Sequence, residues 1–183
     1  FGNAGWLTPS LAVPLPAPGL IWKSLGWLFD PESPLYIQPR LDPLLARWLV
    51  GFLAASRRSR FERGVAALVE LSRTSVDFWE ALAKSRSESF GFARRGLVSI
   101  YESRSAFDAA RRNVELVARQ GVRFEVWSAE EVRAREPAVI GAQVGAYFFP
   151  DDAHCEPYPA VRALAAEAVL AGALILEDTE LFG

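Results

Sequence analysis

His154 is the only histidine in the 183-residue chain, and it stands in a polar turn with Asp151, Asp152 and the only cysteine, Cys155. A histidine placed there could hydrogen-bond a carboxylate or pass on a proton near neutral pH. Local hydrogen bonds before a following helix explain the same polar residues equally well. One His, one Cys and two Asp this close together lack the ligand spacing of a zinc site, so we expect no metal and no catalytic side chain here.

Two tyrosines on expected strands, Tyr101 and Tyr147, could line a pocket for a small molecule. Tyrosine supplies an apolar wall and a hydroxyl that can bind a carboxylate. Ordinary packing within a sheet explains both residues as well. Arg94 and Arg95, just before a strand, could hold a carboxylate through paired hydrogen bonds, or could be surface charges.

The chain opens with small residues followed by prolines. Asn3, Ala4 and Gly5 precede Trp6 and Leu7, and the run TPSLAVPLPAPG follows. Small residues let a backbone lie close to a flat ligand, and glycine reaches backbone angles closed to other residues. The prolines favour an extended, non-helical path. An irregular terminal loop without a ligand is the alternative interpretation.

The composition of the chain argues against a nucleic-acid-binding protein, a disulfide-stabilised protein and a membrane-spanning protein. A formal charge of −2 argues against nucleic acid as the main partner. A single cysteine excludes an internal disulfide framework and favours a reducing, cytoplasmic compartment. The apolar run over residues 44–55 is too short for a membrane span, which needs roughly 20 residues. The chain contains no methionine, and we interpret it as part of a longer protein.

Periodicity and capping signals predict alternating helices and strands. Asp42 before Pro43 marks one helix start, and Ser128 with Glu131 forms a second start signal, a capping box. Ser105 is expected to cap a further helix. The helices are expected over residues 42–55, 61–83, 105–121, 128–137 and 157–172, and the strands over residues 35–38, 96–102, 122–126, 145–149 and 173–176. This pattern predicts an α+β fold with a mixed, largely antiparallel sheet and flanking helices.

The N-terminal segment resembles the stretch that passes the flavin ring in FAD-dependent D-amino acid dehydrogenases and other members of the glycine oxidase and D-amino acid oxidase superfamily. The motifs GLVSIYES, GVRFEVWSAEEVRAREP and GAYFFPDDAHCEPYPAVRALAAEAVLAGALI follow in the same order as in that family. The resemblance covers nearly the whole chain. It implies a flavin-facing crossing segment over residues 1–20, a substrate-binding or cap domain over 21–150, and a return helix and strand over 151–183.

The resemblance also implies a function and the residues that carry it. The protein would oxidise a D-amino acid, or an amine of the hydroxyproline type, by hydride transfer to FAD, and electrons would pass to oxygen or to a respiratory quinone chain. The cofactor-binding residues would be Asn3, Ala4, Gly5, Trp6 and Leu7. The substrate-binding residues would be Tyr101, Tyr147 and His154. Since no Gly-x-Gly-x-x-Gly motif occurs in the chain, we expect the chain alone not to retain FAD.

A second hypothesis treats the chain as an interaction or membrane-docking module without catalytic activity. It depends on the aromatic residues of one region, Trp22, Trp27, Phe29, Trp48 and Phe52. Aromatic and aliphatic faces suit the interfacial zone of a bilayer. For the enzyme as well, this region allows peripheral contact with the inner face of the cytoplasmic membrane.

Overall fold

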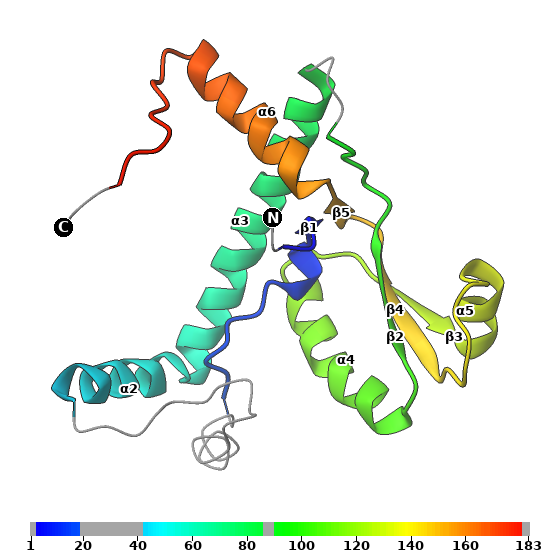
Figure 1. The fold of residues 1–183 in the computed structure, drawn as a ribbon. Helices are drawn as coiled ribbons and strands as arrows, with labels where there is room; N and C mark the ends of the chain where they lie inside the picture. Colours follow the sequence, from blue (N-terminus) through cyan, green and yellow to red (C-terminus); the bar gives the residue numbers. More distant parts are fainter. Residues whose placement is uncertain (1–2, 19–41, 86–89, 181–183) are drawn as a thin grey trace.

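A computed structural model describes residues 3–18, 42–85 and 90–180. The expected strand at 35–38 and the aromatic residues Trp22, Trp27 and Phe29 lie outside these ranges. Figure 1 shows the long helix α3 crossing the middle of the molecule, with α2 at one end. The elements in chain order are β1 (Trp6–Leu7), a 3₁₀ turn (Pro9–Leu11), α2 (Pro43–Ala55), α3 (Arg58–Ser85), β2 (Leu97–Tyr101), α4 (Arg104–Ala118), β3 (Glu125–Ser128), α5 (Ala129–Arg135), β4 (Gly145–Phe149), β5 (Ala153–His154) and α6 (Pro157–Leu170).

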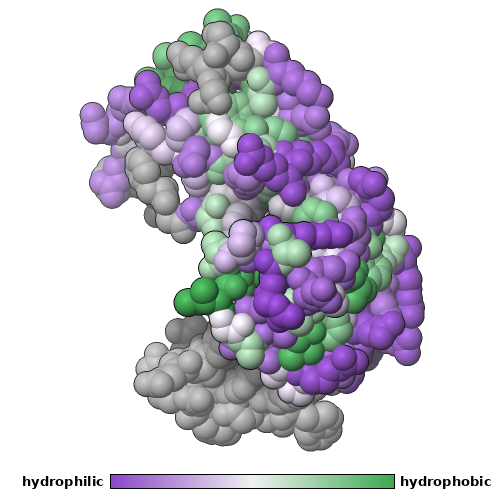
Figure 2. All heavy atoms as spheres, turned by 90° about the vertical axis from the view of Figure 1, so that its right-hand side faces the viewer, coloured by the Kyte–Doolittle hydropathy of each residue, from purple (hydrophilic) through white to green (hydrophobic). Residues whose placement is uncertain are grey.

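The main sheet has three antiparallel strands in the order β2-β4-β3. The central strand β4 pairs Phe149 with Leu97 on one side and Phe148 with Glu125 on the other. Side chains of β4 alternate between the two faces, so one face packs on α3 and α4 and the other on α5. The outer surface on the side of the molecule that carries α5 is mostly hydrophilic, with apolar patches (Figure 2). The predicted α+β fold with a largely antiparallel sheet is confirmed.

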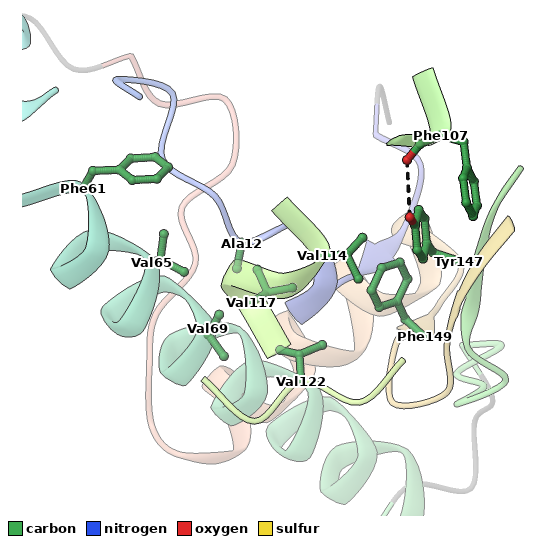
Figure 3. Close-up of a cluster of buried hydrophobic side chains, with 10 residues drawn as sticks. All are labelled: Ala12, Phe61, Val65, Val69, Phe107, Val114, Val117, Val122, Tyr147 and Phe149. Atoms are coloured by element: carbon green, nitrogen blue, oxygen red, sulfur yellow. Dashed lines mark hydrogen bonds between the residues drawn. The ribbon is translucent and has the colours of Figure 1, made fainter. Parts of the chain in front are cut away.

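The largest apolar cluster lies between α3, α4 and β4 (Figure 3). Val65 and Val69 of α3 face Val114 and Val117 of α4, and Tyr147 enters from the sheet. Residues three or four apart on a helix share a face, which is why these pairs meet. The N-terminal segment contributes Ala12 to the same cluster, so the start of the chain is part of the core.

Two of the predicted helix start signals, at Asp42 and at Ser128, act as expected. The Asp42 carboxylate accepts a hydrogen bond of 2.8 Å from the Leu44 N–H, with Pro43 in the first turn. At α5, Ser128 accepts from the Glu131 N–H, and the Glu131 carboxylate accepts from the Ser128 N–H. Each cap satisfies N–H groups that have no partner within the helix.

Most predicted boundaries differ from the observed ones by one to three residues, and two of these differences have a clear physical reason. Ser103, and not Ser105, caps α4, because Ser103 has the extended backbone of an N-cap and its hydroxyl accepts from the Ala106 N–H. The strand predicted over 122–126 is β3, which spans Glu125–Ser128. The reason is the length of its partner: β4 ends at Phe149, before Pro150, which has no N–H to donate.

The closing strand predicted over 173–176 is also wrong. Residues 173–180 follow α6 without forming a strand and lead away from the rest of the molecule (Figure 1). Leu174 is 82% exposed. An apolar run becomes a strand only when a neighbouring strand completes its hydrogen bonds, and none of the described strands lies beside it.

Candidate functional site

The N-terminal segment meets the turn after β4 in a second, two-stranded sheet. β1 and β5 are antiparallel, with Trp6 opposite His154 and Leu7 opposite Ala153. Figure 1 shows them side by side beneath α6. On the other side of β5, Ala93 and His154 exchange two backbone hydrogen bonds of 2.9 and 3.0 Å. Three distant parts of the chain therefore converge on His154.

This small sheet has one buried and one exposed face. Leu7 packs against the cluster that contains Leu82 and Cys155, and Ala153 is buried. Directly opposed residues of an antiparallel pair lie on the same face, so Trp6 and His154 share the other one. Both are exposed, Trp6 by 59%. The exposed face therefore presents a flat indole beside an imidazole.

Glycine is required at position 5, because the return segment (residues 151–183) passes close to it at Cys155. The φ of Gly5 is +68°, a backbone region that favours glycine. Its carbonyl accepts a hydrogen bond of 2.9 Å from the Cys155 N–H, and its own N–H donates to Asn3 Oδ1 at 2.8 Å. A Cβ on Gly5 would lie 1.9 Å from the Cys155 carbonyl oxygen. Close approach of the Cys155 carbonyl is enough to explain why glycine stands here, and the approach of a flat ligand stays a prediction.

Asp152 is a buried carboxylate that sequence reasoning did not single out. It is 1% exposed, and one oxygen accepts from the Ser10 N–H at 3.3 Å while the other accepts from the Ser10 hydroxyl. Burial raises the pKa of Asp152 to about 6, against the lowering effect of both Ser10 hydrogen bonds. The neighbouring Asp151 raises it further. Nothing in the local sequence shows which aspartate of this pair is buried.

Asp151 and Arg94 belong to a surface network of charges. Arg94 lies 2.9 Å from Glu80 of α3 and 4.0 Å from Asp151. Arg123 forms a salt bridge with Asp151 that is the main cause of the lowered pKa of this carboxyl. Since Arg94 is engaged with carboxylates of the chain itself, the structure supports its interpretation as a surface charge.

The two candidate tyrosines lie together but apart from His154. Tyr101 and Tyr147 are on the main sheet, with ring centroids 5.8 Å apart, whereas His154 is on the small sheet. Tyr147 is 2% exposed, stacks on Phe107 at 4.6 Å and donates a hydrogen bond of 3.3 Å to the Phe107 carbonyl (Figure 3). Desolvation raises the pKa of both tyrosines. Their role in substrate binding stays a prediction, and Tyr147 also serves the core.

Within the described ranges, no three His, Cys, Asp or Glu side chains are grouped as metal ligands. Cys155 is buried, and desolvation is the main cause of the raised pKa of its thiol. A raised thiol pKa disfavours the reactive thiolate, so Cys155 acts as a small core residue.

Comparison with known proteins adds the family. The model of the DAO family, described as FAD dependent oxidoreductase, matches residues 1–183. The chain belongs to this family. It is 42% identical over 156 residues to D-amino acid dehydrogenase 2 of Ralstonia nicotianae, which covers 83% of the chain and 37% of that relative. It is 29% identical over 182 residues to D-amino acid dehydrogenase of Agrobacterium fabrum, covering 98% of the chain and 44% of the relative.

Two solved structures of this family resemble the fold. L-proline dehydrogenase from P. horikoshii matches with a TM-score of 0.58 and 27% identity, covering 64% of this chain and 31% of the other. Glycine oxidase from Geobacillus kaustophilus matches with a TM-score of 0.57 and 28% identity, covering 63% and 32%. The chain spans less than half the length of the curated relatives it matches.

The close approach at Gly5 gives a first prediction. Gly5→Ala should lower the free energy of unfolding by about 3 kcal/mol, because a methyl group would add a clash with Cys155 to the cost of a positive φ. Gly141→Ala is the matched control: its φ is +99°, but a Cβ there meets nothing within 4 Å. It should cost only about 1 kcal/mol. Equal losses in urea unfolding would show that β5 does not constrain position 5.

Burial of Asp152 gives a second prediction. Its folded-state pKa, about 6, is above the ordinary value of 3.8, so its proton stabilises the fold fully below about pH 4, and this contribution is lost as pH rises through 6. Asp152→Asn cannot titrate. Between about pH 4 and pH 7 the wild type should lose on the order of 2 kcal/mol of unfolding free energy relative to this variant. Urea unfolding at both pH values measures the difference, and a constant difference would contradict the burial of Asp152.

Proposed function

We propose that the protein to which this chain belongs is an FAD-dependent dehydrogenase of D-amino acids or related amines. The observation that carries the proposal is the 42% identity to D-amino acid dehydrogenase 2, which extends over 83% of the chain. The residues 1–20, 21–150 and 151–183 would be the flavin-facing crossing, the substrate-binding domain and the return towards the FAD domain. L-proline dehydrogenase and glycine oxidase, which share the fold, point to the same class of amine substrate.

The exposed face of the small sheet fits a flat cofactor. Asn3, Ala4 and Trp6 are exposed, whereas Gly5 is buried and bonded to Cys155 and Leu7 packs on the apolar cluster beneath α6, so both hold the segment in place. We place Asn3–Leu7 at the cofactor for this reason. Bound FAD would supply the redox chemistry by accepting a hydride from the substrate α-carbon. The chain would supply orientation and exclude water from one side.

The substrate would be held by groups from both sheets. His154 lies beside Trp6 on the exposed face. Tyr101, which is partly exposed, and Tyr147 would contribute from the main sheet. A tyrosine hydroxyl can bind the carboxylate of an amino acid. Hydride transfer from a neutral amine needs no side-chain base, so this chemistry does not require His154 to take up a proton.

A surface of α2 suggests where a membrane would contact the protein. This helix has no buried residue, and Leu44 and Val50 are 74% and 67% exposed. Residues 43–61 contain four arginines, Arg47, Arg57, Arg58 and Arg60, and no acidic residue. Exposed Leu and Trp together with Arg suit an anionic bilayer surface.

None of the helices in the described ranges combines the length and the apolarity needed to cross a bilayer. The same surface would serve a docking module without catalytic activity, which is the second candidate function.

The decisive experiment is anaerobic reduction. The purified flavoprotein that contains this chain should lose its flavin absorbance when a D-amino acid is added, and L-proline and glycine serve as the alternative substrates. The 183-residue chain alone should be colourless, since it has no Gly-x-Gly-x-x-Gly turn. A longer protein that binds no flavin would favour the docking module.

We expect His154 to orient rather than to catalyse. His154→Ala should lower the rate of flavin reduction less than about tenfold, short of the roughly 10²–10⁴-fold contribution of a positioned acid or base. Stopped-flow reduction at matched flavin content measures this. A thousandfold loss with intact flavin would make His154 a catalytic residue.

Membrane contact through α2 can be tested with vesicles. Trp48→Ser should reduce co-sedimentation with vesicles that contain anionic phospholipid by about fivefold or more, because it removes an exposed aromatic ring. Phe78→Ser on α3 is the control, since Trp48 and Phe78 are equally exposed, at 49%. Equal binding of the wild type and both variants would exclude α2 as the contact.

A further inference from the structure

Two contacts hold the N-terminal segment against the return segment, one at either end of the small sheet. At one end the Cys155 N–H donates to the Gly5 carbonyl at 2.9 Å. At the other end Ser10 donates both its N–H and its hydroxyl to the Asp152 carboxylate. β1 lies between these contacts and contains only two residues. Its position therefore depends on what fixes each end.

Asp152 is itself anchored to the main sheet. Its carbonyl accepts a hydrogen bond of 2.9 Å from the Gly96 N–H, directly before β2, and its N–H points to the Phe149 carbonyl at the end of β4, at 3.4 Å. The Asp152 side chain therefore links Ser10 to a rigid part of the fold. A shift of β1 relative to the sheet would strain or break these two side-chain contacts.

Stability alone does not call for a carboxylate here. A buried carboxylate loses its hydration, and a neutral residue of the same shape is usually as stable or more stable. The neighbouring Asp151 adds a like charge, and its salt bridge with Arg123 offsets that charge only in part. What the Asp152 side chain provides is geometry, since its two terminal atoms engage both the N–H and the hydroxyl of one residue, a contact that an amide of the same shape keeps. Ser10 is thereby fixed in position and orientation.

We propose that Asp152 is a positioning residue, which acts through Ser10 to set where β1 and the exposed Trp6–His154 face lie. This inference rests on the proposed function, because that face is where we place the flavin. Asp152 contacts neither cofactor nor substrate in this assignment. Its removal should displace the crossing segment, weaken flavin binding and leave the main sheet folded.

Cys155 reports on the small sheet without any need for flavin. Cys155 is 8% exposed, its backbone is bonded to Gly5, and Leu7 of β1 packs against the apolar cluster that contains it. Separation of β1 from the return segment removes part of this cover, so a maleimide should then reach the thiol more often. Labelling of the Cys155 peptide, followed by mass spectrometry in the flavin-free protein, therefore measures how often this contact opens.

The test uses the flavoprotein that contains this chain. Ser10→Ala and Asp152→Ala should each increase Cys155 labelling at least tenfold and weaken FAD binding, measured by fluorescence titration, at least tenfold. Asp152→Asn should stay within about threefold of wild type, because its amide can still accept from and donate to Ser10. The double variant Ser10→Ala/Asp152→Ala should bind FAD no more weakly, and label no faster, than whichever single variant has the larger effect. The reason is that both substitutions remove the same contact. If Asp152→Ala fails to fold, Ser10→Ala decides alone.

Ser103→Ala is the matched control. It removes a serine hydroxyl that caps α4, away from the small sheet, and should change neither labelling nor FAD affinity. If Ser103→Ala and Ser10→Ala raise labelling equally, Asp152 has only a general structural role and the inference is overturned. Wild-type FAD binding with unchanged affinity in both Ser10→Ala and Asp152→Ala also overturns it, while leaving the proposed function intact. A wild type that binds no FAD overturns the proposed function, and the positioning role falls with it.

Discussion

The fold depends on one long-range closure, the pairing of the N-terminal segment with the turn that leads into α6. Ser10 and Asp152 are 142 residues apart in the chain, and bringing such distant residues together costs conformational entropy. A two-residue strand cannot offset that cost by its own hydrogen bonds. Buried neighbours supply the remainder: Leu7 packs on the cluster beneath α6, and Ala12 enters the cluster between α3 and α4.

The main sheet serves as the rigid reference for this closure. β4 is its central strand, paired on both sides and covered by helices on both faces. The polar turn at 150–152 follows it directly, so the position of Asp152 is set by the most supported strand of the chain. A two-stranded sheet such as β1–β5, exposed on one face, would be expected to move relative to the main sheet. Here the buried Asp152 carboxylate connects β1, through Ser10, to the turn that follows β4.

The chain belongs to the FAD dependent oxidoreductase family, and the arrangement of its two sheets bears on how a cofactor and a substrate would be held. The small sheet turns Trp6 and His154 outward, whereas Tyr101 and Tyr147 lie on the main sheet. The predicted binding residues thus fall into two groups, joined through residues 93–96 and the turn after β4. A substrate that touched both groups would depend on the relative placement of the two sheets, and the Ser10–Asp152 contact fixes β1 within that placement.

The sequence alone determined the features that depend on a few adjacent residues: the caps at Asp42 and Ser128, the strand at 145–149, the α+β class and the family resemblance. These signals are local because a cap or an alternating strand needs only its neighbours in the chain. Tertiary structure decided the rest. The strand expected at 122–126 moved to the residues that β4 could pair, and the run at 173–176 had no described partner. Which of two adjacent aspartates is buried was decided by Ser10, far away in sequence, because burial of a carboxylate requires donors that only the folded chain brings to it.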